Sequence, residues 1–252
     1  VTPVNEPGIT ALSTARYGAW NDRLSSDADH ARVLALVVLA NLEALARFRA
    51  DRPTAWVGSE GVTAHTPNSG TPDQVARRRE RGWLVWDLHL GLDPLPGGAR
   101  LLDHVDDDVL ARIADLAVRD GVIAGHDVYP VSVRSAPGEQ LTIPDIMSAC
   151  HDELVRWHDR YDVPFWIAET SNLTLPVAEQ EAWLDALTDT CRTLQREGRP
   201  VRGICWYSRG DQYDWQTMLT EPTGAVTEVG LFDTERRPRP VAARFAELAG
   251  GS

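Results

Sequence analysis

The chain has 252 residues, 43% of them hydrophobic and 25% charged, which is typical of one soluble domain with a large core. The formal net charge of −12 argues against nucleic acid and anionic membranes as partners, because both attract basic surfaces. A neutral, small-molecule substrate fits this charge better. All 25 basic residues are Arg, so the absence of Lys excludes Schiff-base and Lys-general-base chemistry. No apolar run is long enough to span a bilayer.

The three cysteines, Cys150, Cys191 and Cys205, have no metal-ligand spacing. Their odd number favours buried reduced thiols over a disulfide framework, which predicts a cytoplasmic setting. We also expect no cofactor.

The first predicted element is a short strand over residues 1–4, which runs into Asn5 and Glu6. Asp27 is a plausible N-cap for a long amphipathic helix over residues 28–49, because apolar residues recur there at spacings of three and four. A second strand is predicted over residues 54–59 and ends at Glu60.

The middle of the chain alternates between helices and strands. A helix is predicted over residues 74–81, whereas residues 84–90 alternate between apolar and polar and suggest a half-buried strand or a loop-edge element. The remaining predicted elements, in chain order, are a helix over 106–120, a strand over 122–128, a helix over 144–161, a strand from 163 that carries Glu169, a helix over 177–196, a strand over 201–207 and a helix over 241–248.

This alternation indicates a single parallel α/β domain over residues 1–252. Glu6 and Glu169 each follow a short apolar strand, and in α/β barrels that end of the strand carries the chemistry. Only five strands are predicted, near residues 1, 54, 122, 163 and 201, whereas a closed (β/α)8 barrel needs eight. Five βα units are therefore three too few to close such a barrel.

Several segments, taken in order, resemble family 1 glycoside hydrolases, the retaining β-glucosidase family. The Asn5-Glu6-Pro7 motif resembles the motif after the family's fourth barrel strand, and Glu169-Thr170-Ser171 stands where the family has Glu-Asn-Gly on strand seven. The other similar segments are residues 30–49, Gly82-Trp83 with Asp93-Pro94, Asp127-Val128-Tyr129, Ser208, residues 211–215, residues 230–233 and Arg237-Pro238. The resemblance covers nearly the whole chain, and it implies that the chain begins at the family's fourth barrel strand, with strands one to three of the (β/α)8 barrel absent from it.

The resemblance implies a retaining β-glycosidase in which Glu169 is the nucleophile and Glu6 the acid/base. It further implies that Tyr129 donates its hydroxyl to Glu169 and that Asn5 binds the sugar 2-hydroxyl. The residues expected to contact the substrate are Asn5, Asp127, Trp206, Tyr207, Asp214 and Trp215. Three of them depart from the family, in which Asp127 is an Asn, Tyr207 a Trp and Asp214 a Glu.

Simpler readings remain for single residues. Either Glu alone is commonly a strand-end ion pair, Tyr129 can be a core residue, and a Trp such as Trp206 is more often core than a sugar platform. His151 and His158 lie seven apart without a third ligand, so no metal site is expected. A non-catalytic carbohydrate-binding or scaffold protein is the alternative function, and a second polypeptide or oligomer partner that completes the barrel is a further possibility.

Overall fold

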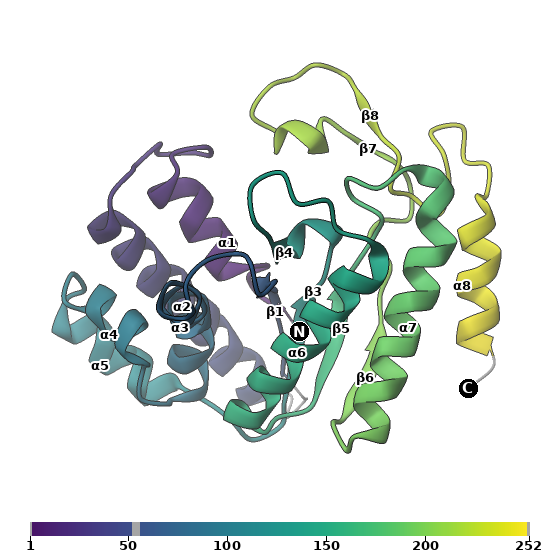
Figure 1. Ribbon diagram of the computed structural model, residues 1–252. Coiled ribbons are helices and arrows are strands. Elements are labelled where there is room, and N and C mark those ends of the chain that lie inside the picture. The colour runs from purple at the N-terminus through teal and green to yellow at the C-terminus, as the bar shows by residue number, and fades with distance from the viewer. Residues whose placement is uncertain (1, 52–55, 251–252) are drawn as a thin grey trace.

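The computed structural model describes residues 2–51 and 56–250, and a parallel β-sheet runs through its centre (Figure 1). The sheet contains β1 (Trp56–Gly61), β3 (Val122–Asp127), β5 (Phe165–Glu169) and β6 (Val201–Ile204), in that order. Asn5 forms a parallel bridge with Ser59, so the end of the strand predicted over residues 1–4 lies beside β1. Five strand positions therefore lie side by side in chain order.

The strand order identifies the barrel type of α/β architecture. Each strand pairs in parallel with the next one along the chain, whereas a doubly wound sheet reverses its order at a switch point. The register aligns the strand ends, since Gly61 lies opposite Asp127, and Asp127 lies opposite Glu169. The predicted parallel α/β barrel arrangement with five βα units is confirmed.

Helices connect the strands and surround the sheet (Figure 1). The main helices are α2 (Asp27–Asp51), α3 (Pro72–Leu90), α4 (Pro96–Leu102), α5 (Asp107–Leu116), α6 (Ile143–Tyr161), α7 (Gln180–Arg196) and α8 (Pro240–Gly250). The short elements are α1 (Pro7–Ala11), a π-helical turn (Leu12–Arg16), the 3-10 turns Pro130–Ser132, Val177–Glu179 and Trp215–Thr217, and the strand pairs β2 (Ala64–His65) with β4 (Val133–Arg134) and β7 (Gln212–Tyr213) with β8 (Val226–Thr227). None of the described helices is both long and apolar enough to cross a membrane.

Local sequence explains where α3 begins and ends. Thr71 and Gln74 form a capping box, in which the Thr71 side chain accepts from the backbone N–H of Gln74, and Pro72 occupies the first turn. Gly91 ends the helix in the left-handed conformation, at φ 68°, where glycine carries no Cβ penalty. Thr142 and Asp145 form the same box at the start of α6.

The prediction for residues 84–90 was wrong, because they form the last two turns of α3. All seven residues are buried, including the polar Asp87 and His89. This part of the chain packs against several neighbours at once, since α3 contacts α2, α4 and α5, while Asp87 is paired with Arg160 of α6. A helix end buried on all sides has no apolar stripe, so its sequence lacks the helical period.

The other predicted helices are confirmed, with shifted ends. The 106–120 helix stops at Leu116, and the strand predicted over 201–207 stops at Ile204. Val1, Thr54 and Ala55, which belong to two predicted strands, lie outside the described residues.

The first strand position is tied to the helices by buried polar groups. The backbone N–H of Val4 donates to Oδ1 of Asn41 on α2 at 3.0 Å, and the Asn41 amide lies 2.9 Å from Nε2 of His89 on α3. Asn41 is 1% exposed, so these bonds are made away from water. They fix the backbone that presents Asn5 and Glu6 at the end of the sheet.

Candidate active site

Three acidic side chains from different strand ends interact at the C-terminal edge of the sheet. Glu6 follows the bridge residue Asn5, Asp127 ends β3, and Glu169 ends β5. The carboxyl groups of Glu6 and Asp127 influence each other's ionisation, and the charge of Glu169 acts on both of them. The two glutamates predicted to form the catalytic pair are therefore electrostatic neighbours in one site.

Burial and mutual repulsion disfavour ionisation of this cluster. Glu6 and Asp127 titrate as a pair, and burial is the largest cause that raises their pKa values, to about 8 for Glu6 and about 9 for Asp127. Repulsion by Glu60 and Glu169 raises the pKa of Glu6 further. Glu6 therefore retains a proton at neutral pH, as a general acid must.

Tyr129 is a hydrogen-bond partner of Glu169. Its hydroxyl donates to Oε2 of Glu169 at 2.8 Å, which is the contact predicted from the sequence. The backbone N–H of Tyr129 donates to the hydroxyl of Ser132 at 3.0 Å, so the tyrosine is held by the turn after β3. Burial and the charge of Glu169 raise the pKa of Tyr129 well above its ordinary range, so the phenol stays protonated and remains a donor.

Asp127 is supported by a residue that the sequence analysis missed. The hydroxyl of Ser59, on the adjacent strand β1, donates to Oδ2 of Asp127, and both residues are buried. An isolated Ser in a strand carries no sequence signal, so only the strand pairing reveals this contact.

The aromatic residues after β6 separate into two groups. Tyr207 and Trp215 pack together with ring centroids 4.9 Å apart, and both are partly exposed. Burial and the charges of Glu169 and Glu6 raise the pKa of Tyr207, which places it beside the acidic pair. Tyr207 and Trp215 thus form an aromatic surface next to the carboxyl groups.

Trp206 differs from its neighbour, because it belongs to the core. It is 6% exposed, and its indole N–H donates to the carbonyl oxygen of Val229 at 2.9 Å. Its ring is not available as a platform for a sugar, and the simpler reading of this tryptophan fits the structure.

Asp214 fastens the loop that carries Trp215. Its Oδ1 accepts hydrogen bonds from the backbone N–H groups of Thr223 and Ala225 and from the Thr223 hydroxyl. The bond to the Thr223 hydroxyl is the main cause that lowers the pKa of Asp214. The predicted contact of Asp214 with a sugar hydroxyl remains a prediction, as does that of the exposed Asn5.

Two further residues near the cluster were not predicted as part of it. Glu60 is the penultimate residue of β1 and is 5% exposed, and the strand-end signal that identified Glu6 and Glu169 applies to it equally. Cys205 interacts electrostatically with Glu169 and Asp127. The expectation of three buried thiols was wrong for Cys205, which is exposed, whereas Cys150 and Cys191 are buried, and all three cysteines are free.

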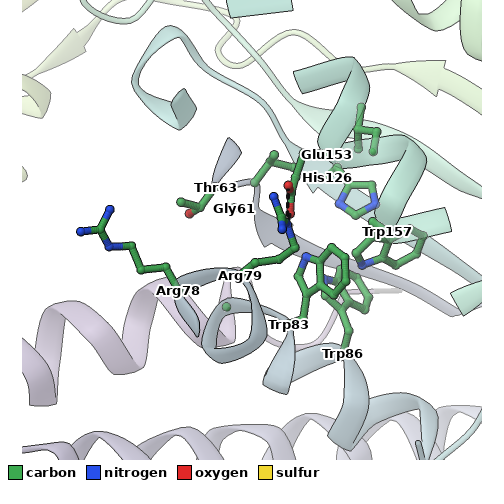
Figure 2. A pocket seen from close by; sticks show the side chains of 12 residues that line it. Gly61, Thr63, Arg78, Arg79, Trp83, Trp86, His126, Glu153 and Trp157 are labelled. Atoms are coloured by element: carbon green, nitrogen blue, oxygen red, sulfur yellow. Dashed lines mark hydrogen bonds and ion pairs between the residues drawn. The ribbon is translucent and has the colours of Figure 1, made fainter. Parts of the chain in front are cut away.

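A small cavity of about 30 Å³ lies outside the acidic cluster, between α3 and α6 (Figure 2). It is lined by His126, the residue before Asp127. Because adjacent strand residues point to opposite faces of a sheet, the cavity and Asp127 lie on different faces. In Figure 2, Arg79 and Glu153 meet at this cavity, with their side chains 2.8 Å apart. Its position on the helix-covered face separates it from Glu6 and Glu169.

The described residues hold no cluster of three or more His, Cys, Asp or Glu side chains arranged to bind a metal ion.

Comparison with known proteins gives a result only at the level of structure. No family model and no curated protein matches the sequence. Among solved structures, a family 1 β-glucosidase from Thermotoga maritima superposes with a TM-score of 0.78 over 99% of this chain, at 13% identity. The chain has the family 1 β-glucosidase fold.

Other structures with the family 1 β-glucosidase fold agree. The Thermotoga maritima enzyme in complex with azafagomine gives a TM-score of 0.80 at 13% identity, and a β-glucosidase from Exiguobacterium antarcticum gives 0.78 at 14%. Each match covers 99% of this chain and 63% of the β-glucosidase chain. The chain thus spans less than two thirds of these relatives, as the five strand positions also indicate.

Proposed function

We propose that the chain is a retaining β-glycosidase that hydrolyses a β-glycoside by double displacement. The observation that carries this proposal is the carboxyl pair at the strand ends, in which Glu6 is protonated at neutral pH and Glu169 accepts a hydrogen bond from Tyr129. A retaining glycosidase needs one protonated carboxyl group to release the leaving group and one carboxylate to attack the sugar. The family 1 β-glucosidase fold supports the assignment.

In the first step, Glu169 attacks the anomeric carbon while the proton of Glu6 passes to the departing glycosidic oxygen. The bond from sugar to aglycone breaks as the bond from sugar to Glu169 forms. The hydrogen bond from Tyr129 holds the Glu169 side chain in one orientation, so that one oxygen is presented to the sugar.

In the second step, the ionised Glu6 takes a proton from water, and the water oxygen attacks the anomeric carbon. Glu169 leaves as a carboxylate, and Glu6 is protonated again. Asn5 lies directly before Glu6 and is exposed, so its amide is available to a sugar hydroxyl. Tyr207 and Trp215 provide aromatic faces for the C–H face of the sugar.

The test is chemical rescue of a nucleophile variant. Glu169→Gly removes the attacking carboxylate, so hydrolysis of an activated aryl β-glycoside should be lost, and added azide should restore turnover and yield a glycosyl azide. Glu235→Gly makes the same change at an exposed position and should leave hydrolysis intact and insensitive to azide. Unchanged activity of the Glu169 variant would refute the assignment.

A non-catalytic carbohydrate-binding protein is the second candidate. It is favoured by the three positions at which the chain departs from the family, Asp127, Tyr207 and Asp214, and by the 63% coverage of the relatives. Titration with aryl glycosides and free sugars separates the two candidates, because binding without turnover supports this one. Turnover that appears only with a co-purifying polypeptide would instead identify a partner that completes the barrel. A cytoplasmic location stays a prediction.

A further inference from the structure

The backbone at Glu6 has an unusual conformation. Glu6 is the N-cap of α1 and adopts the left-handed region, with φ 42° and ψ 63°, which is unfavourable for a residue with a Cβ. Its own side chain makes no capping bond to the helix. Another residue must therefore accept the hydrogen bonds that an N-cap side chain usually accepts from the first backbone N–H groups of the helix.

The carboxylate of Glu60 provides the missing cap from the neighbouring strand. Its Oε2 accepts the backbone N–H of Gly8 at 2.6 Å, and its Oε1 accepts the N–H of Ile9 at 3.3 Å. These N–H groups are among those that a helix start leaves without an intrahelical partner. Oε1 also accepts the N–H of Gly61 at 3.0 Å, so the same carboxylate joins α1 to the end of β1.

Two glycines make this close approach feasible. A Cβ on Gly8 would lie 2.9 Å from Oε2 of Glu60, and a Cβ on Gly61 would lie 3.0 Å from Oε1 of Glu6. Contacts of about 3.0 Å are shorter than a carbon atom tolerates, so a side chain at either position would displace a carboxyl group. The Glu60 side chain is thus packed against the backbone at Gly8, and the Glu6 side chain against the backbone at Gly61.

Glu60 also acts on Glu6 through its charge. It is buried, and burial raises its pKa to about 8, opposed by the bond from Gly8. Repulsion by Glu60 is the second largest cause of the raised pKa of Glu6, after burial. Glu60 and Glu6 titrate in the same pH range, and within that range an ionised Glu60 favours the protonated form of Glu6.

We propose that Glu60 is a positioning residue for the general acid: it caps α1 from β1 and holds Glu6 in the left-handed conformation. This inference rests on the proposed function for the role of Glu6, whereas the contacts that carry it are those of Glu60 with Gly8, Ile9 and Gly61. Glu60 does not touch the reacting atoms and acts only through Glu6.

The test is the titration of Glu6, followed by carboxyl ¹³C NMR in the intact chain. Glu60→Gln keeps the side-chain size but removes the charge, so the pKa of Glu6 should fall by roughly one unit. Glu60→Asp keeps the charge and should restore part of the shift. Glu153→Gln removes another buried carboxylate, which lies on α6 and is paired with Arg79 of α3, and should leave the titration of Glu6 unchanged.

Gly8→Ala provides a second, independent perturbation, because the added Cβ pushes the Glu60 carboxylate away while leaving its charge in the chain. The control is Gly82→Ala, where no atom lies within 4 Å of the added Cβ. Gly8→Ala should shift the Glu6 titration and reduce amide-exchange protection at Ile9, whereas Gly82→Ala should change neither.

An unchanged Glu6 titration in folded Glu60→Gln and Gly8→Ala proteins would overturn the positioning role. The titration requires no turnover, so its outcome is separate from that of the glycosidase proposal. A wild-type chain that shows the shift but fails to hydrolyse any aryl glycoside would count against the proposed function alone.

Discussion

Replacing Asp127 with Asn should stabilise the protein at neutral pH. Burial raises the pKa of Asp127 from 3.8 to about 9, so the folded protein holds a proton on this side chain at pH 7 whereas the unfolded chain does not. Folding at pH 7 therefore takes up a proton about three pH units above the pKa of the unfolded chain. At 1.36 kcal/mol per unit, this lowers the free energy of unfolding by up to about 4 kcal/mol. Asn carries no such cost, and its carbonyl oxygen still accepts the Ser59 hydroxyl.

The sign of the pH dependence follows from the raised pKa. The stability associated with protonated Asp127 is fully present below the unfolded pKa and is lost as the pH rises toward 9. Urea unfolding of wild type and Asp127→Asn should therefore give a gain of up to about 4 kcal/mol at pH 7 and little difference at pH 4. Asp214→Asn is the control, because the pKa of Asp214 is lowered and its removal gives no such gain. Equal stabilities at pH 7, or the same gain at both pH values, would refute the reasoning.

Two further predictions concern single contacts. Tyr129→Phe removes the hydrogen bond to Glu169, and because a bond to a charged group contributes about 1.5–3 kcal/mol, kcat for an aryl glycoside should fall roughly 10- to 100-fold. A rate within twofold of wild type would contradict this. Arg160→Met leaves the fully buried Asp87 without its ion-pair partner and should lower the free energy of unfolding by about 3–5 kcal/mol, measured by urea denaturation. The exposed Arg192→Met should cost less than about 0.5 kcal/mol, and equal losses in both variants would show that burial is not the cause.

The sequence predicts the architecture well where amphipathic helices alternate with short apolar strands. The helix over residues 28–49 is confirmed within α2 (Asp27–Asp51), because one of its faces is buried against α1, α3, α4 and α5 and the other faces solvent. The end of α3 was misread because it is buried on all sides and Asp87 and His89 mimic the polar positions of a strand. Periodicity fails wherever burial is not one-sided.

The site is predicted only where a strand end delivers a side chain directly. Glu6 and Glu169 were identified in this way, whereas the contact from Tyr129 to Glu169, which is present, was implied only by the family resemblance. Ser59 acts through the pairing of β1 with β3, which no local pattern encodes, whereas Glu60 has the same strand-end signal as Glu6 and Glu169 and was not assigned to the site. Trp206 was assigned by its residue type, but its burial and its hydrogen bond to the carbonyl oxygen of Val229 make it a core residue.

The most direct test of the central claim is to trap the covalent intermediate. A 2-fluoro-2-deoxy-β-glycoside with a good leaving group should inactivate the chain, and mass spectrometry of its peptides should find one sugar on Glu169. In Glu6→Gln, a substrate that needs no acid should still label Glu169, although release by water should be slow. A folded chain that gains no label, or gains it on a carboxylate other than Glu169, would contradict the account.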